Sequence, residues 1–211
     1  MPNRFFVTGT DTSVGKTVVS ALLCVALDAI YWKPIQTGTR EGTDRSAVMR
    51  MAGLPVDRTI PETFRFSPPV SPHLASKRAG VRIDLRKIAI PRMGEREALI
   101  VEGAGGVLVP INDRQLMTDL MAHLGLPVLL VSRSSLGTIN HTLLSLAALR
   151  AARIDVRGVV MSGKKNEENR KAIERYGKAQ VIGVVPPLAR INESALKDAF
   201  RRHFDRKVFA L

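Results

Sequence analysis

The stretch GTDTSVGKT, from Gly9 to Thr17, constrains the fold of this chain more than any other segment. It ends in the Gly-Lys-Thr of a phosphate-binding loop, but five residues, where the usual pattern has four, separate Gly9 from Gly15. Apolar residues before the stretch predict a strand, and apolar residues after it predict a helix. Backbone N–H groups and the positive end of a helix dipole converge at such a junction, which favours a bound anion.

The end of this loop carries the chemistry of a phosphate site. Gly15 lets the backbone approach an anion closely, and Lys16 brings a positive charge to the outer phosphates. The hydroxyl of Thr17 lies where Mg²⁺ binds in such loops. The alternative is a structural turn. Because the motif directly follows the first expected strand and directly precedes a helix, we predict a phosphate site.

Short apolar segments alternate with helical segments along the rest of the chain. The strands apolar on both faces are typical of a parallel sheet covered by helices on each side. We therefore predict a three-layer α/β fold with a mostly parallel central sheet, formed by one domain over residues 1–211. Between residues 38 and 91, which are rich in Pro and Arg, we expect only one helix. The expected strands are 4–9, 30–35, 97–106, 126–132, 156–163 and 180–188, and the expected helices are 16–29, 44–53, 138–153, 166–177 and 192–204.

Composition limits the classes of protein that fit. The chain has 211 residues, of which 45% are hydrophobic and 24% charged, as is ordinary for a globular protein. No apolar run is long enough to cross a membrane, and the first residues lack the pattern of a secretory signal. The single cysteine, Cys24, excludes an internal disulfide, so we expect a cytoplasmic protein in which Cys24 is a buried apolar side chain.

The net charge of +13, from 32 Lys and Arg against 19 Asp and Glu, raises the question of a polyanionic partner. Nucleic acid and small polyanions such as nucleotides both fit this charge. The cations are scattered along the chain, and aromatic residues, which stack on bases, make up only 5% of it. We therefore expect small-molecule partners, with neither nucleic acid nor a membrane, and a basic nucleic-acid-binding protein remains the weakest alternative.

Three further charged residues are candidates for the same site. Glu102 ends an apolar strand before a Gly turn, where a carboxylate can be the second protein ligand of Mg²⁺. Asp44 opens an expected helix, so it is either a ligand or an ordinary first-turn acid. Lys33 ends an expected strand just before Pro34, where it either faces the ligand crevice or simply faces water. Without further information, a side chain that faces water is the better interpretation of Lys33.

Taken together, five segments resemble the dethiobiotin synthetase family. They are FFVTGTDTSVGKT, WKPIQTG, VSPHLAS, LIVEGAGGVLVPI and LGTINHTLL, and their order in the chain matches that family. The long loop is the family's own variant. The resemblance implies a P-loop NTPase-like fold, a homodimer, and the ATP-dependent carboxylation of 7,8-diaminopelargonate with CO₂. It also implies a reaction that passes through a carbamate and then a carbamic-phosphoric anhydride. Closure of a cyclic urea completes the reaction, which releases ADP and phosphate.

The resemblance also implies a role for individual residues. Lys16 and Lys33 are the expected catalytic residues, and Thr17, Asp44 and Glu102 are the expected Mg²⁺ ligands. Thr37 is expected to contact the substrate, and Asn140 to bind its carboxylate across the dimer interface. His73 is either a base or part of the substrate wall. The residues expected to contact ATP are Ser13, Val14, Gly15, Lys16, Thr17, Val18, Asp44, Glu102, Gly103, Ala104, Gly105, Ser162, Pro186, Pro187 and Leu188.

The chain departs from the family's pattern in three places. The segment before Lys33 is shortened, Ser13 replaces the Glu of several members, and Ser162 replaces an Asn that reads adenine. Ser162 has one hydroxyl where an amide has a paired donor and acceptor. Within the same broad class, another P-loop ATPase or an amide-forming synthetase is the alternative. A ParA-type partitioning ATPase is disfavoured, because such chains carry a second Lys early in the loop, where this one has Gly9, Thr10 and Asp11.

Overall fold

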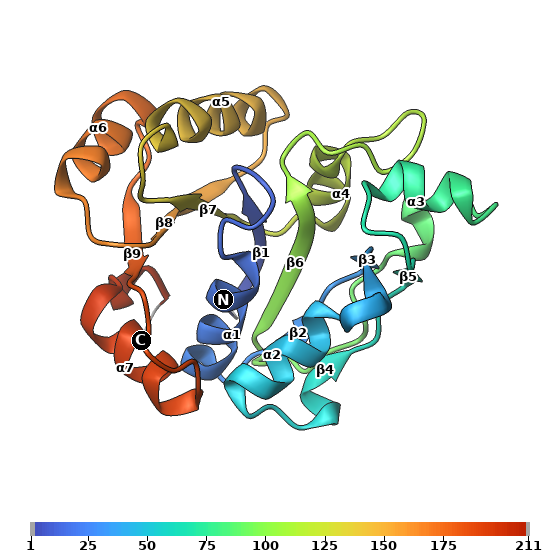
Figure 1. Ribbon diagram of the computed structural model, residues 1–211, viewed down its shortest axis with the longest axis horizontal. Helices are drawn as coiled ribbons and strands as arrows, with labels where there is room; N and C mark the ends of the chain where they lie inside the picture. Colours follow the sequence, from blue (N-terminus) through green and yellow to red (C-terminus); the bar gives the residue numbers. More distant parts are fainter. Residues whose placement is uncertain (1–2, 210–211) are drawn as a thin grey trace.

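The computed structural model describes residues 3–209, and a parallel sheet of seven strands forms its centre (Figure 1). The strand order is β4-β2-β6-β1-β7-β8-β9, so the first strand lies in the middle of the sheet. The strands are β1 (Arg4–Gly9), β2 (Ile30–Trp32), β4 (Thr59–Ile60), β6 (Leu99–Gly106), β7 (Val128–Arg133), β8 (Val156–Ser162) and β9 (Val181–Val185).

Helices cover both faces of this sheet, which confirms the three-layer α/β prediction. One face packs against α1 (Lys16–Leu27), α2 (Asp44–Ala52) and α7 (Glu193–His203). The other packs against α4 (Met117–Leu124), α5 (Thr138–Ala151) and α6 (Glu167–Gly177), with α3 (Pro72–Arg78) at its margin. Each face buries its own apolar cluster, and burial of apolar surface on both sides is what holds a parallel sheet together.

The alternation of side chains along β6 decides which residues reach the site. Leu99 and Val101 point into the cluster below α4 and α5, whereas Ile100 points into the cluster below α1. Glu102, two residues after Ile100, lies on the α1 side at the carboxyl end of the strand, because successive side chains alternate between faces. Strand β1 pairs with β6 on one side and β7 on the other, so the loop after β1 begins next to Glu102.

Local sequence explains where the helices begin. Asn192 caps α7 by accepting a hydrogen bond from the backbone N–H of Ala195, as predicted for this helix. Thr43 caps α2 by accepting a hydrogen bond from the N–H of Ser46, which leaves Asp44 as the first helical residue. Gly15 precedes α1 with φ of 102°, a conformation that side chains rarely adopt.

The segment after α1 corrects the predicted strand 30–35. It breaks into β2 and β3 (Ile35–Gln36), and β3 pairs with β5 (Phe64–Arg65) in a separate two-stranded sheet. Pro34 has no N–H to donate to a ladder, so the strand ends there and the chain turns away. This break places Lys33 at the carboxyl edge of the main sheet and brings Gln36 into contact with Asp44 at the start of α2.

Several further elements were missing from the prediction. Residues 38–91 contain α3 as well as α2, and they supply β4, a two-residue edge strand. The eight residues of α4 were also not predicted, although Met117, Leu120 and Met121 bury one face of that helix. The predicted strand 180–188 ends at Val185, before Pro186 and Pro187. The other predicted strands and helices are confirmed, with shifts of a few residues at their ends.

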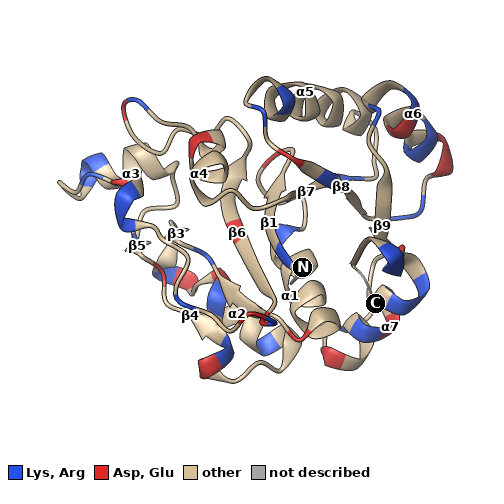
Figure 2. Cartoon of the chain, turned by 180° about the vertical axis from the view of Figure 1, so that it is seen from behind, with Lys and Arg blue, Asp and Glu red and all other residues tan. Residues whose placement is uncertain are grey.

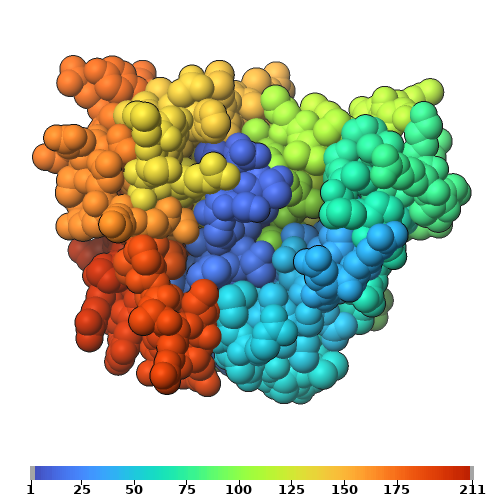
Figure 3. All heavy atoms as spheres, in the orientation of Figure 1, coloured from blue at the N-terminus to red at the C-terminus, as the bar shows by residue number. Residues whose placement is uncertain are grey.

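The molecular surface is hollowed around the loop. Figure 3 shows residues of the first segment, in blue, exposed between the later segments that surround them on one face. Charged residues are spread over several elements and do not form one continuous band, as Figure 2 shows from behind. Among residues 3–209, no helix is both long and apolar enough to cross a membrane.

Candidate active site

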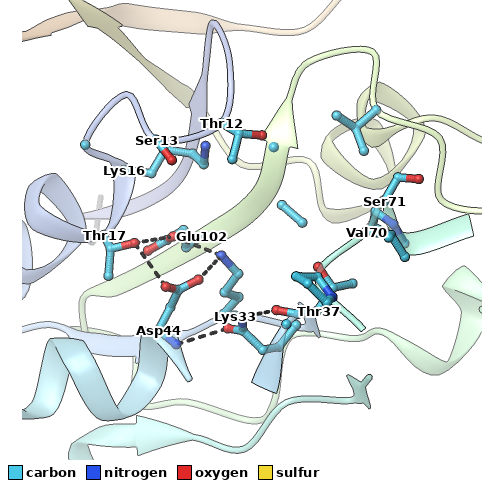
Figure 4. A pocket seen from close by; sticks show the side chains of 18 of the residues that line it. Thr12, Ser13, Lys16, Thr17, Lys33, Thr37, Asp44, Val70, Ser71 and Glu102 are labelled. Carbon is cyan, nitrogen blue, oxygen red and sulfur yellow. Dashed lines mark hydrogen bonds and ion pairs between the residues drawn. The ribbon is translucent and has the colours of Figure 1, made fainter. Parts of the chain in front are cut away.

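A cavity of about 710 Å³ opens at the carboxyl edge of the sheet (Figure 4). The phosphate-binding loop and the start of α1 form one wall, and the end of β6 forms another. The segment from Lys33 to Asp44 and the turn around Val70 complete it. Of the predicted site residues, those that line it are Ser13, Gly15, Lys16, Thr17, Val18, Lys33, Thr37, Asp44, Glu102, Ala104 and Gly105.

The loop holds Lys16 in a buried position, and no carboxylate within residues 3–209 forms an ion pair with it. Its side-chain amine donates a hydrogen bond to the backbone oxygen of Asp11 at 2.9 Å. Burial lowers the pKa of Lys16 to about 8, although the nearby carboxylate of Glu102 acts in the opposite direction. An anion placed against this ammonium would stabilise its charged form. The loop therefore presents a positive charge that gains from a phosphate ligand.

The buried ammonium of Lys33 joins two carboxylates. It donates to Glu102 Oε1 at 3.0 Å and to Asp44 Oδ2, and only 5% of Lys33 is exposed. Thr17 Oγ1 lies 3.0 Å from Glu102 Oε1 and 3.4 Å from Asp44 Oδ1 (Figure 4). The interpretation of Lys33 as a water-facing lysine is therefore wrong. Asp44, left open by the sequence, belongs to this cluster.

Burial and charge act against each other in the cluster. Burial alone would lower the pKa of Lys33, but the carboxylates of Glu102 and Asp44 outweigh it, so the pKa is raised. Burial alone would raise the pKa of Asp44, but the ammonium of Lys33 outweighs it, so that pKa is lowered. The pair is therefore charged at neutral pH, with a positive group fixed next to the loop.

Two supporting residues were missed by the sequence analysis. The phenol of Tyr31 donates to Glu102 Oε2 at 3.0 Å, and burial raises its pKa well above the ordinary value. The side-chain oxygen of Gln36 accepts the backbone N–H of Asp44 at 3.1 Å. Tyr31 precedes Lys33 by two residues, a spacing that puts both side chains on one face of a strand. That spacing was the available signal.

The oxygens around the loop fit a hard divalent cation. Thr17, Asp44 and Glu102 supply a hydroxyl and two carboxylates, the donor types that Mg²⁺ prefers. Within residues 3–209, no group of three or more His, Cys, Asp or Glu side chains could hold a metal by itself. In proteins Mg²⁺ usually binds one or two carboxylates together with substrate phosphates.

The far end of the cavity is less charged. Thr37, Val70 and Ser71 line the side away from the loop (Figure 4). His73 is not among the lining residues, and its ring nitrogen Nδ1 lies 3.0 Å from the hydroxyl of Ser71. This arrangement favours the interpretation of His73 as a support for the wall of the cavity.

Several predicted residues lie outside the cavity lining. Val14 is buried under the loop, and a side chain on Gly103 would point at the Phe6 ring, on the opposite face from Glu102. Ser162 is next to the loop, since a Cβ on Gly15 would lie 2.6 Å from its hydroxyl oxygen.

The remaining residues of that set lie farther along the chain. Pro186 lines a separate hollow beside Arg202, Leu188 packs against the core, and neither Pro187 nor Asn140 lines the cavity. Asn140 is exposed in the first turn of α5. The residues expected to contact phosphate and Mg²⁺ therefore mostly line the cavity of one chain, whereas those expected to contact the base and the substrate carboxylate do not.

Sequence comparisons give one family repeatedly. A family model described as an AAA domain matches residues 3–195. The chain is 46% identical to the ATP-dependent dethiobiotin synthetase of Rhodopseudomonas palustris strain HaA2, with 99% of this chain and 97% of that protein covered. It is 50% identical to the enzyme of the same description from Paramagnetospirillum magneticum, with 90% and 91% covered. For the one from Brucella melitensis biotype 1 the identity is 45%, with 100% and 98% covered.

Solved structures are similar in fold alone. A ParA family ATPase from Chlorobium tepidum is 13% identical with a TM-score of 0.55, covering 94% of this chain and 90% of that one. A nucleotide-binding protein in complex with ADP from Archaeoglobus fulgidus is 14% identical with a TM-score of 0.56, covering 96% and 92%. Both have the architecture of P-loop nucleotide-binding proteins, in agreement with the predicted fold.

Proposed function

The chain belongs to the ATP-dependent dethiobiotin synthetase family of biotin biosynthesis, and we propose that the cavity beside its loop is where the cyclic urea forms. The observation that carries this assignment is the position of Lys33. Its ammonium is buried between Asp44 and Glu102, at the edge of a cavity that also contains Lys16. Two cations that line one cavity suit a reaction that brings two anions together.

The proposed reaction has three steps. One amine of 7,8-diaminopelargonate adds to CO₂ and loses a proton, which forms a carbamate. A carbamate oxygen then attacks the γ-phosphorus of ATP, and the bond to the bridging oxygen breaks to release ADP. The second amine attacks the carbamate carbon, loses a proton, and expels phosphate as the ring closes.

The cations of the cavity have separate tasks in this proposal. Lys16 and the backbone N–H groups of the loop hold the outer phosphates; this task is supported by the buried ammonium of Lys16, which donates to the backbone oxygen of Asp11. Lys33 faces the carbamate and the transferring phosphoryl group, and it reduces the repulsion between them. Mg²⁺ bound by Thr17, Asp44 and Glu102 would supply further positive charge at the phosphates. Thr37 contacts the reacting end of the diamine.

Turnover of the complete mixture tests the assignment. Purified protein with 7,8-diaminopelargonate, CO₂ and ATP should form dethiobiotin, ADP and phosphate in equal amounts. Leaving out any one substrate should stop formation of all three. ATP hydrolysis that is independent of the diamine, with no cyclic urea, would favour another ATPase of the same class.

Glu102→Gln tests the metal site, because it keeps the size of the side chain and removes its charge. We expect the Mg²⁺ concentration for half-maximal rate to rise at least tenfold, since losing only a supporting partner of a ligand already costs about 10- to 100-fold. The control is Glu95→Gln, which changes an exposed acid. If the Mg²⁺ dependence of the rate is the same in both variants, Glu102 has only a structural role.

An exposed stripe on and before α5 supports the proposed homodimer. Leu136, Asn140 and Leu144 are spaced by four residues and are all exposed, and the two leucines are 102% and 63% exposed. Large exposed apolar side chains next to a residue expected to bind substrate are typical of a contact surface. A second copy covering this stripe would bring Asn140 to the partner's cavity, which one chain does not do by itself.

Sedimentation tests this assembly. The chain mass is 23.1 kDa, so a twofold dimer has ~46 kDa. Leu144→Glu places a charge in the proposed contact and should shift the protein toward monomer, with activity falling in parallel. A wild-type monomer with full activity would contradict the shared site.

Base selectivity should be weak if Ser162 is the group that faces the base. The phosphates and Mg²⁺ are common to all triphosphates, and one hydroxyl discriminates poorly between base edges. We expect kcat/KM for GTP and CTP to lie within about tenfold to a hundredfold of that for ATP. A ten-thousandfold preference for ATP would show that another group reads the base.

A further inference from the structure

Tyr31 connects a buried strand to the proposed cation site without touching the cavity. Strand β2 pairs with β6 so that Tyr31 lies opposite Ile100, and both side chains lie on the α1 face of the sheet. Glu102 is two residues farther along β6 on the same face, within reach of the phenol. Tyr31 is fully buried, Glu102 is 1% exposed, and the phenol donates to Glu102 Oε2 at 3.0 Å.

The two oxygens of Glu102 therefore have different partners. Oε1 receives the hydroxyl of Thr17 and the ammonium of Lys33, both at 3.0 Å, on the side of the cavity. Among the described residues, only the phenol of Tyr31 donates a hydrogen bond to Oε2, and Tyr31 is absent from the cavity lining. In this arrangement Oε1 of Glu102 faces the cavity, and Oε2 is hydrogen-bonded inside the protein.

We propose that Tyr31 is a positioning residue that makes Glu102 a one-oxygen ligand of the nucleotide-bound cation. This inference rests on the proposed Mg²⁺ site. Mg²⁺ is small and demands near-octahedral geometry, whereas Ca²⁺ accepts carboxylates through both oxygens. A phenol that occupies Oε2 fixes the rotation of the carboxylate and opposes two-oxygen binding. Tyr31 thus raises affinity for Mg²⁺ and selects it over Ca²⁺.

Tyr31→Phe removes the phenol oxygen and keeps the ring that packs in the core. The matched control is Tyr176→Phe, which makes the same chemical change at an exposed position on α6. For each variant and for wild type, calorimetry measures the dissociation constant of ADP in EDTA, with Mg²⁺ and with Ca²⁺. The affinity in EDTA serves as the internal check on the fold, because it depends on the loop and not on the cation.

We expect Tyr31→Phe to bind ADP in EDTA with the same affinity as wild type. The factor by which Mg²⁺ increases the ADP affinity should be about 10- to 100-fold smaller in the variant than in wild type. The affinity added by Ca²⁺ should fall less or increase, so the Mg²⁺-to-Ca²⁺ preference should decrease. Tyr176→Phe should match wild type in all three conditions.

Three results would overturn the inference. One is an unchanged Mg²⁺ effect and an unchanged preference over Ca²⁺ in Tyr31→Phe. Another is an equal loss of ADP affinity in EDTA and in Mg²⁺, which is the result expected if Tyr31 only supports the fold. The third is a wild-type protein whose ADP affinity does not respond to Mg²⁺, which also removes the proposed cation site. The first two results leave the proposed function intact.

Discussion

Replacing Lys33 with methionine should lower kcat by about a hundredfold to a thousandfold, the usual effect of removing a group that stabilises transition-state charge. Methionine keeps most of the length of the side chain and removes the ammonium. The carboxylates of Asp44 and Glu102 then lose the cation that neutralises them. Single-turnover rates, with enzyme and ATP at saturating concentrations over a limiting amount of diamine, separate this loss from any change in binding.

The same variant should also be less stable. Breaking a buried ion pair by removing one partner typically costs about 3–5 kcal/mol, because the other charge stays buried without compensation. Asp44 is about one third exposed, so a value at the low end is expected. Urea unfolding measures this change, and Lys171→Met, at an exposed position on α6, is the control. A stable variant with near-normal kcat would show that Lys33 has neither role.

Replacing Lys16 with alanine should reduce turnover by about a hundredfold or more and leave the fold intact. The ammonium of Lys16 donates only to the backbone oxygen of Asp11 and has no carboxylate partner in the described structure, so its removal exposes no buried charge. Loss of charge stabilisation at the outer phosphates is worth about 3 kcal/mol. Rapid-quench measurement of phosphate release, together with a urea unfolding curve, checks both parts.

The pKa of Lys16 is lowered and that of Lys33 is raised, so removing each lysine should change the free energy of unfolding differently. Because the pKa of Lys16 is lowered to about 8, its charged form opposes folding at neutral pH. The wild-type free energy of unfolding should therefore gain a contribution as pH rises from about 8 toward 10.5, which Lys16→Ala lacks. At pH 7 the alanine variant should be at least as stable as wild type. Normal turnover in this variant would contradict the nucleotide site.

The phosphate loop could be predicted because its chemistry is contiguous in sequence. Lys16 and Thr17 are neighbours, and their strand and helix flank them directly. Lys33 and Glu102 come together only because β2 pairs with β6, a pairing between segments about seventy residues apart, which no local pattern reveals. Local chemistry therefore left Lys33 as an exposed residue, and only the family resemblance indicated its place.

Other errors have different causes. Strand β4 has two residues and its position depends on pairing with β2, so it carries no periodic signal of its own. Pro34 lies inside an apolar run that reads as one strand, yet its missing N–H divides that run between two sheets. Tyr31 resembles a core residue in such a run. Its hydroxyl has a partner only after the sheet has formed.

In the proposed reaction a carbamate oxygen attacks ATP, and ring closure later expels this oxygen with the phosphate. The most direct test supplies CO₂ labelled with ¹⁸O, with reaction times shorter than the exchange of that label with water. Mass spectrometry of the phosphate should then show one ¹⁸O atom transferred from CO₂ for each dethiobiotin formed. Phosphate without ¹⁸O, formed together with dethiobiotin, would contradict the anhydride and with it the proposed task of Lys33.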